Sequence, residues 1–441
     1  MTESSQSTAM FNRFFHSEVS GSIALMACTI VALIWANSPW SQSYLDFTHI
    51  KVGFSWGDAS LNLTLQHWIN DALMAIFFFV VGLEVKREIG IGQLSTLRKA
   101  ALPVSAAIGG MLVPALFYFA MNVDGPGAQG WGIPMATDIA FALGLLALFG
   151  SRAPIGLKVF LTALAIADDI GAVLVIAIFY TANLKLGALA VAGIFMLLIA
   201  GARAVGIRRS GIYLLLAVGV WLGVLTSGIH ATVAGILVAM LVPIRAKIEP
   251  ETFMKRAKDR IAELESAILT RDSMVADKAQ LHALDDIHET TRDMIPPGIA
   301  LEHRLHPVQA FLILPLFALF NAGVYLGGDA LGQTTDPIAI GIILGLVLGK
   351  QVGVLGFSWI SIKAGFADLP EGVRWPHIWG AACLSGVGFT MSLFITELAF
   401  IDPAQIAKAK LGILEASLIA GILGYWVLSK SLPKTPKSRN E

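Results

Sequence analysis

The chain has 441 residues, of which 56% are hydrophobic and only 14% charged, and its mean hydropathy is +0.71. A water-soluble chain of this length would need far more polar surface. The formal net charge is zero, so nothing indicates binding to nucleic acid. Both cysteines, Cys28 and Cys383, lie in apolar stretches, so we expect neither a disulfide framework nor a cysteine metal site.

Apolar segments of about 18 residues or more succeed one another along the chain, which is typical of an all-α polytopic membrane protein. The polar start lacks the short apolar region and cleavage site of a signal peptide, so we expect the first helix to be retained. The N-terminal arm, the C-terminal tail and the connections on that side hold most of the Lys and Arg outside the long polar stretch, which places both termini in the cytoplasm. Twelve transmembrane helices are predicted, at about 19–37, 66–88, 100–121, 131–150, 155–180, 185–205, 211–226, 229–245, 308–327, 336–362, 377–400 and 408–429.

These segments divide the chain into four parts. Residues 1–245 carry helices one to eight, 308–429 carry helices nine to twelve, and 430–441 form a cytoplasmic tail. Between the two membrane parts lies the only long polar stretch, 246–307. Its first half, Pro250 to Ser273, has apolar residues at helical spacing and is separated from the ninth span by Pro296-Pro297. We expect a charged cytoplasmic helical excursion, and a partner site is one use for it.

Two adjacent acids, Asp168 and Asp169, lie near the middle of the fifth predicted span. A carboxylate at mid-membrane costs roughly 2.5–3.5 kcal/mol on insertion scales, so a pair of them calls for a function. Successive side chains on a helix point about 100° apart, so the two cannot share one partner without a wide polar cavity. We interpret them as lining a water-accessible path. The alternative is that one of them pairs with a basic residue only to dock two helices.

The fourth and eleventh predicted spans are both interrupted. In the fourth, Pro134 precedes Thr137-Asp138, and a proline frees a carbonyl that lipid cannot satisfy. In the eleventh, closely spaced glycines are expected to interrupt the helix. Interrupted segments at corresponding places in two halves indicate a transporter built from repeats, although chance similarity among common membrane residues is the alternative. An offset of 248 residues aligns the two segments, pairing Trp131 with Trp379, Gly132 with Gly380, Thr137 with Ser385, Phe141 with Phe389 and Leu145 with Leu393.

Opposed half-helices would bring partial charges of about half a unit to the point where they meet. Asp138 suits the positive helix ends, and Lys350, in the tenth predicted span, suits the negative ends. Direct pairing of Lys350 with Asp169 in one conformation is the other possibility, and the sequence does not choose between them.

A second group of charged residues is predicted at the cytoplasmic face. Glu84, Arg87 and Glu88 share one helical face where the second span leaves the membrane. Histidine titrates near neutral pH, so a pH-responsive cluster is one interpretation of the residues that crowd the start of the ninth span. For the Glu84 group the alternative is a solvated helix end, and for the residues at the start of the ninth span it is an interfacial polar turn. The crowded residues are Glu302, His303 and His306.

Several long motifs occur in an order that resembles the NhaA family of bacterial sodium/proton antiporters, and the resemblance covers the chain from Phe14 to Leu428. This family is itself a known example of an inverted-repeat transporter. The motifs are Trp68-Ile-Asn-Asp71-Ala-Leu-Met-Ala, Val81-Gly-Leu-Glu84-Val-Lys-Arg-Glu88, Ala136-Thr-Asp138-Ile-Ala-Phe-Ala-Leu-Gly144, Ala167-Asp168-Asp169 and Leu384-Ser-Gly-Val-Gly-Phe-Thr-Met391.

The resemblance implies twelve helices with inverted repeats, crossed interrupted helices four and eleven, and a bacterial inner-membrane location with both termini cytoplasmic. It also implies electrogenic, pH-regulated exchange of cytoplasmic sodium or lithium for external protons, without a cofactor. The long stretch before Glu302 departs from the compact form of the family. By motif match, Asp168 and Asp169 would bind the ion, Asp138 and Lys350 would compensate charge, and the pH-responsive residues would be Glu84, Arg87, Glu88, Glu302, His303 and His306.

The residues themselves fit such an exchange. Sodium is a hard cation that prefers oxygen ligands, which Asp168, Asp169 and the Thr137 hydroxyl would supply. A carboxylate can hold a proton or help to hold a metal ion, so the two ions compete for one site.

A sodium-coupled symporter of a small organic solute is the alternative function, and it would require a larger pocket. No HExxH motif indicates an enzyme, and an acid pair alone does not define a reaction. Membrane lipid is the expected surrounding, and a homodimer is one option for an oligomeric state that the sequence leaves open.

Overall fold

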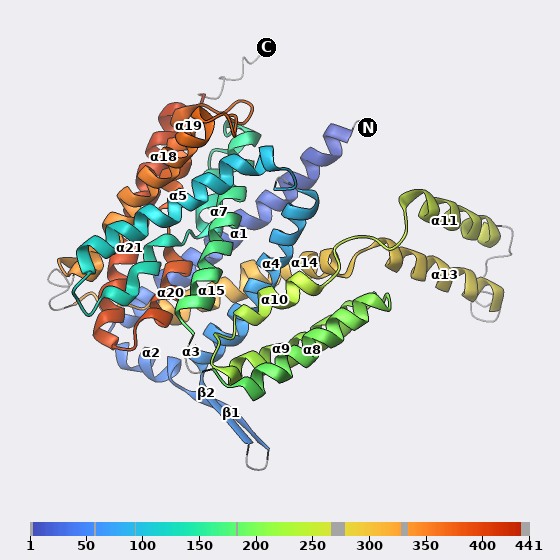
Figure 1. The fold of residues 1–441 in the computed structure, drawn as a ribbon, viewed down its shortest axis with the longest axis horizontal. Helices are drawn as coiled ribbons and strands as arrows, with labels where there is room; N and C mark the ends of the chain where they lie inside the picture. Colours follow the sequence, from blue (N-terminus) through green and yellow to red (C-terminus); the bar gives the residue numbers. More distant parts are fainter. Residues whose placement is uncertain are drawn as a thin grey trace.

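The computed structural model describes residues 3–56, 59–92, 94–181, 184–265, 278–327 and 334–433. These residues form a bundle of long helices, and one short antiparallel hairpin, β1–β2, projects from the end opposite the start of α1 (Figure 1). The all-α polytopic class predicted from the sequence is confirmed.

The elements are joined mostly through short connections. In the first half they are α1 (Glu3–Ala36), α2 (Ser41–Thr48), β1 (Lys51–Trp56), β2 (Ala59–Thr64), α3 (Leu65–Trp68), the π-helical turn η1 (Ile69–Leu73), α4 (Met74–Ile91), α5 (Leu97–Asn122), the 3₁₀ helix η2 (Ala128–Met135), α6 (Ile139–Ala147), η3 (Gly150–Arg152), α7 (Ile155–Phe179), α8 (Leu186–Ala204), α9 (Ser210–Ser227) and α10 (Val233–Leu241). In the second half they are α11 (Pro250–Glu265), α13 (Lys278–Met294), α14 (Pro297–Val308), the π-helical turn η4 (Gln309–Ile313), α15 (Leu314–Asn321), α17 (Pro337–Leu344), the π-helical turn η5 (Gly345–Gly349), α18 (Lys350–Lys363), α19 (Trp375–Ser385), α20 (Phe389–Ala399) and α21 (Pro403–Ser431).

Among the described residues, 10 helices are long and apolar enough to cross a membrane, and the bent pair α19 and α20 raises the number to 11. The segment 229–245, predicted to be the eighth span, forms only the 9-residue helix α10. At about 1.5 Å per residue, such a helix covers less than half of a bilayer's hydrocarbon core. The predicted count of twelve is therefore not confirmed.

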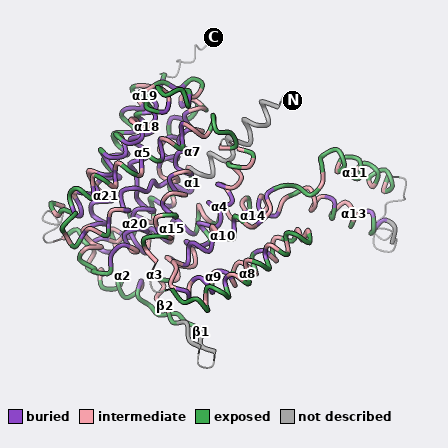
Figure 2. The backbone as a smooth tube through the Cα atoms, in the orientation of Figure 1, coloured by how far each residue is buried: buried purple, intermediate pink, exposed green. Residues whose placement is uncertain are grey.

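Apolar side chains on the outside of the bundle match a lipid surrounding. Buried residues concentrate in the helices at the centre, whereas α8 and α9, which pack on each other, are mostly exposed or half-buried (Figure 2). Their exposed residues include large apolar ones, such as Leu197 and Leu215, each 73% accessible. Such a surface would be unfavourable in water but suits contact with hydrocarbon.

The charged connection forms two helices, α11 and α13, which pack on each other and project from the bundle (Figure 1). Arg260 on α11 joins them by an ion pair with Asp286 on α13, with 2.5 Å between Nε and Oδ2. Both helices lie within the predicted excursion, whose cytoplasmic location stays a prediction, and residues 266–273 of its predicted first half lie outside the described residues. The next membrane helix starts at Pro297, earlier than the predicted 308, because proline favours the first position of a helix.

A tight contact between α5 and α18 fixes the position of Lys350, the first residue of α18. Where these helices meet, a Cβ added to Gly353 would lie 2.1 Å from the carbonyl oxygen of Gly109, so only glycine fits there. Close backbone approach through small residues is the usual way in which membrane helices pack. Lys350 is thereby held deep in the bundle, with no accessible surface on its side chain.

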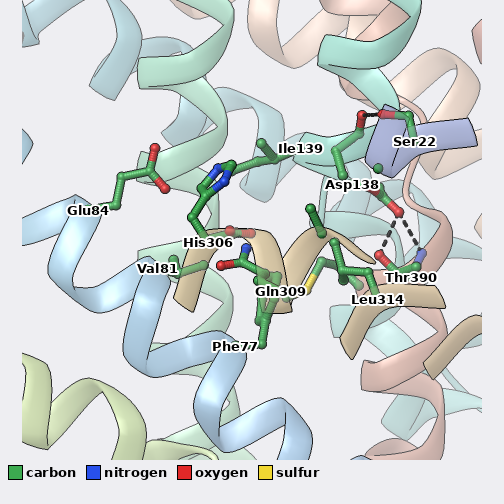
Figure 3. A pocket seen from close by; sticks show the side chains of 15 residues that line it. Ser22, Phe77, Val81, Glu84, Asp138, Ile139, His306, Gln309, Leu314 and Thr390 are labelled. Carbon is green, nitrogen blue, oxygen red and sulfur yellow. Dashed lines mark hydrogen bonds between the residues drawn. The ribbon is translucent and has the colours of Figure 1, made fainter. Parts of the chain in front are cut away.

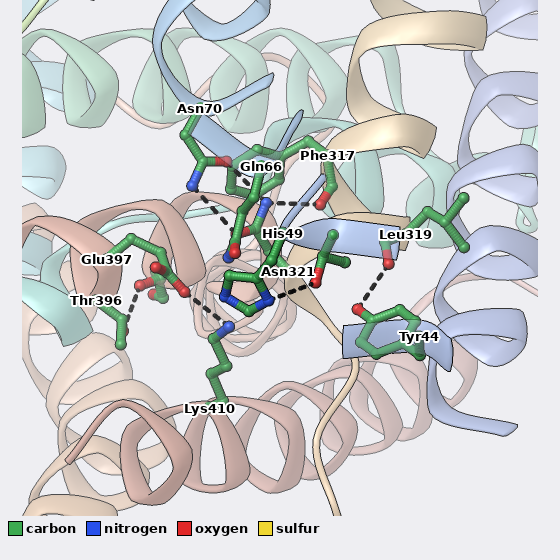
Figure 4. A network of polar contacts seen from close by, with 12 residues as sticks. Tyr44, His49, Gln66, Asn70, Phe317, Leu319, Asn321, Thr396, Glu397 and Lys410 are labelled. Carbon is green, nitrogen blue, oxygen red and sulfur yellow. Dashed lines mark hydrogen bonds and ion pairs between the residues drawn. The ribbon is translucent and has the colours of Figure 1, made fainter. Parts of the chain in front are cut away.

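A polar network lies at the β-hairpin end of the bundle (Figure 4). The buried Asn321 donates to Asn70 Oδ1 at 2.8 Å and accepts from Gln66 Nε2 at 3.2 Å. Lys410 and Glu397 form an ion pair beside it at 2.7 Å. These contacts tie α15 to η1 and α3, and α21 to α20.

Candidate functional site

Two helix interruptions meet at the centre of the bundle. One separates η2 from α6 at residues 136–138, and the other separates α19 from α20 at 386–388 with a bend of 42°. The Asp138 amide donates to the Val387 carbonyl at 2.7 Å, so the breaks satisfy each other's backbone groups at this point. A Cβ on Gly386 would lie 2.4 Å from the Leu346 carbonyl oxygen, which explains the glycine there. The predicted crossing of these helices stays a prediction.

Asp138 connects the N-terminal turns of two helices. Its Oδ1 accepts from the Phe141 amide of α6 at 2.9 Å. Its Oδ2 accepts from the Thr390 amide of α20 at 3.1 Å and from the Thr390 hydroxyl at 2.5 Å. The carboxylate thus lies at two positive helix ends, where a negative charge is stabilised.

Asp168 forms a fully buried ion pair with Lys350. The Nζ of Lys350 lies 2.5 Å from Asp168 Oδ2, and neither side chain has accessible surface. The Thr137 hydroxyl oxygen lies 2.6 Å from the same carboxylate oxygen, 2.9 Å from the Ser385 carbonyl oxygen and 3.0 Å from Lys350 Nζ. Thr137 and Ser385, which the 248-residue offset aligns, therefore contact each other.

In this structure Lys350 does not pair with Asp169, and its role at the negative helix ends stays a prediction. Its ammonium contacts Asp168 rather than Asp169, and it reaches the C-terminal end of α19 only through the Thr137 hydroxyl. The reason is rotational, because neighbouring carboxylates on α7 point in different directions and that of Asp168 faces α18. For Asp168, the structure shows a carboxylate paired with a basic residue, which was the alternative interpretation of the acid pair.

Asp169 lies apart from this ion pair and lines a cavity of about 60 Å³, seen from close by in Figure 3. Among the described residues, no hydrogen-bond partner reaches either of its carboxylate oxygens, although the side chain is buried. We call this space the acid cavity. Its polar lining comes from Ser22, Glu84, Asp138, Asp169, His306, Gln309 and Thr390.

A family model described as Na+/H+ antiporter 1 matches residues 12–428. The chain belongs to the Na+/H+ antiporter 1 family. It is 48% identical over 420 residues to the Na+/H+ antiporter NhaA of Oleidesulfovibrio alaskensis, covering 95% of this chain and 93% of that protein. Over 427 residues it is 47% identical to the Na+/H+ antiporter NhaA of Acidithiobacillus ferrooxidans, covering 96% and 98%. Proteins of the Na+/H+ antiporter 1 family are transporters, so the chain is not an enzyme.

Within this Na+/H+ antiporter 1 fold, five of the six residues predicted to form a pH-responsive face fall into two groups. Arg87 is ion-paired with Glu88 at 2.7 Å and with Glu302 at 3.0 Å, which ties α4 to α14. Glu84 and His306 instead line the acid cavity, and His303 is exposed one turn before His306. The structure brings these residues to adjoining parts of α4 and α14, and their role in a pH response stays a prediction.

Sequence reasoning missed three polar features of this antiporter-family chain. Thr390 belongs to one of the motifs that carry the resemblance, but nothing marked it as the partner of Asp138. His230 Nε2 lies 3.5 Å from Asp71 Oδ1, a contact between distant segments that no local pattern reveals. Gln309 lines the acid cavity, and its only signal was a polar residue within an apolar helix.

Replacing Asp138 with Ala is expected to lower the stability of this Na+/H+ antiporter 1 chain by about 2–3 kcal/mol, because bonds from two helix N-termini to a charged group are lost. Thermal unfolding of the purified variant in detergent measures the loss. Asp402→Ala is the matched control, since Asp402 also caps a helix but is exposed at the start of α21. Equal stability losses in the two variants would contradict a compensating role for Asp138.

Proposed function

We propose that this chain exchanges sodium for protons at the Asp168–Asp169 pair. The observation that carries the proposal is Asp169, a buried carboxyl group that faces a cavity and has no protein partner among the described residues. A carboxylate cannot stay charged and unpaired in such a place, because uncompensated buried charge costs several kcal/mol. It must hold a proton or a cation, so binding of one requires release of the other.

Because Asp168 is paired with Lys350, the exchange of a proton for a cation at the site also affects Lys350. While the two are paired, the pair is neutral, and a sodium ion gains little from Asp168. A cation bound between the two aspartates would draw Asp168 away from the ammonium, and Lys350 would then be a buried charge without a counter-charge. Loss of a proton from Lys350 would relieve that charge. Thr137 would keep the carboxylate in place, since its hydroxyl contacts both Asp168 and the Ser385 carbonyl.

This arrangement suits electrogenic exchange. If binding of one sodium ion releases two protons, one from Asp169 and one from Lys350, one net charge moves across the membrane in each cycle. Alternating access results when the protein changes its opening only with a proton or a cation at the site. Lithium, a smaller hard cation, is expected at the same oxygen ligands.

The direction proposed is export of cytoplasmic sodium against entry of external protons, in a bacterial inner membrane with both termini cytoplasmic. The start of α1 and the end of α21 lie at the same end of the bundle, which fits termini on one side (Figure 1). The relatives are named Na+/H+ antiporters, which supports the same exchange here. The symporter alternative is not favoured, because the acid cavity of about 60 Å³ has no room for an organic solute.

Proton flux into or out of proteoliposomes, recorded on adding sodium, lithium or potassium across a range of pH, tests this function. Sodium and lithium are expected to drive proton movement, and potassium is expected to have no effect. A membrane-potential dye is expected to report charge movement in the same experiment. Proton flux that does not respond to sodium at any pH would refute the proposal.

A further inference from the structure

Gln309 occupies an unusual position in the wall of the acid cavity. It is the first residue of the π-helical turn η4, which interrupts the helix from Pro297 to Asn321. Pro315 lies shortly after this turn and has no amide hydrogen, and its ring would crowd the carbonyl four residues earlier in a regular helix. The wider turn accommodates this proline. π-Helical turns of this kind are frequent at functional sites.

The Gln309 amide lies between α4 and the Asp138 side of the cavity, next to His306 (Figure 3). Its Oε1 is buried, and no described residue donates a hydrogen bond to it. Gln351, by comparison, accepts from Trp379 Nε1 at 2.8 Å and donates to the Val347 carbonyl at 2.7 Å. A buried amide oxygen without a donor is costly unless it serves another ligand.

The neighbours of Gln309 indicate what that ligand is. Glu84 and Asp169 line the same cavity, so the space is rich in oxygen and poor in cationic side chains. Hard cations are bound by carboxylates together with neutral amide and backbone carbonyl oxygens. An amide oxygen accepts a cation but takes up no proton in the ordinary pH range.

We propose that Gln309 is a further oxygen ligand of the transported cation, within the acid cavity that Glu84 and Asp169 also line. The inference rests on the proposed sodium/proton exchange and adds a neutral ligand to its two carboxylates. Gln309 would raise the affinity for sodium without raising the affinity for protons. It would therefore shift the competition between the two ions in favour of sodium at every pH.

Gln309→Met tests the proposal, because methionine has a similar length and lacks the amide oxygen. The sodium concentration giving half-maximal proton flux in proteoliposomes is expected to rise about tenfold or more, as for loss of one bond to a charged group. The maximal rate and the pH profile at saturating sodium are expected to stay as in the unmodified protein. Gln405→Met is the matched control, since Gln405 is a half-buried amide near the start of α21.

A half-saturating sodium concentration within twofold of the unmodified value would overturn the proposal, as would a fall in maximal rate alone. Gln309→Glu provides a second test that does not depend on the methionine variant folding. It supplies a ligand that does take up protons, so sodium affinity is expected to be normal at high pH and to fall more steeply as the pH drops. An unchanged pH dependence of sodium affinity in this variant would contradict the proposal.

The Asp169→Asn variant, measured in parallel, distinguishes failure of the proposed exchange site from failure of the role proposed for Gln309. If that variant still exchanges sodium for protons, the proposed site itself is wrong, whatever Gln309→Met shows. If that variant is inactive and Gln309→Met behaves as the unmodified protein, the exchange stands and only the role of Gln309 is refuted.

Discussion

Asp169→Asn is expected to abolish sodium-dependent proton movement in everted membrane vesicles, while the purified protein keeps its thermal stability. Asparagine has the shape of aspartate but can neither release a proton nor neutralise a cation. The Asp169 carboxyl has no hydrogen-bond partner within the described part of the chain, so the substitution removes no such bond there. Activity is lost without unfolding because the side chain serves the ion and not the packing.

Asp168→Asn is expected to abolish exchange as well, but with a loss of stability, because it leaves the ammonium of Lys350 buried without a counter-charge. The two neighbouring acids are thus distinguished by unfolding temperature rather than by flux. Asp336→Asn is the control for removal of a carboxylate, since Asp336 is paired with Lys408 at 2.6 Å away from the acid cavity. Retained exchange in either site variant would overturn the assignment of the ion site to this aspartate pair.

The sequence was sufficient for the all-α membrane class and for most of the spans, because the length of an apolar segment is imposed by the bilayer. The prediction of spans failed where an apolar segment of sufficient length does not form a helix of that length. The segment 229–245 is apolar enough to be predicted as a span, yet its helix is short because non-helical residues precede α10. The β1–β2 hairpin was missed, although Val52, Phe54 and Trp56 alternate with polar or small residues, the pattern of a strand.

The sequence singled out the buried charged residues that the structure brings together, but it missed Thr390 and Gln309 and did not predict the pairings. An acid inside an apolar run can be recognised from its insertion cost alone, which is why Asp138, Asp168 and Asp169 were found. The partner of Lys350 depends on the rotation of α7 and on the close contact of α5 with α18 at Gly353. Neither is encoded by a local pattern. The start of α14 was encoded, because Pro296-Pro297 marks a helix beginning as well as a break.

Replacing Lys350 with Met is expected to have the largest effect on stability of any single change at the site. Methionine fills much of the same volume but leaves Asp168 without its counter-charge at a position with no accessible surface. Breaking a buried pair from one side costs about 3–5 kcal/mol. Lys408→Met is the control, because the Lys408 side chain is 32% accessible in its pair with Asp336 and exposed pairs contribute only about 0–1 kcal/mol. Thermal unfolding in detergent compares the two variants.

The double variant Asp168→Asn with Lys350→Met decides whether the pair stabilises the fold or serves the ions. Removing both charges leaves a neutral contact, and replacement of a whole buried pair is often neutral for stability. Most of the lost stability is therefore expected to return, while sodium-dependent proton movement stays absent. A double variant as unstable as Lys350→Met alone would show that the cost arises from packing around residue 350. If the double variant exchanged sodium for protons, the coupling assigned to the Asp168–Lys350 pair would be wrong.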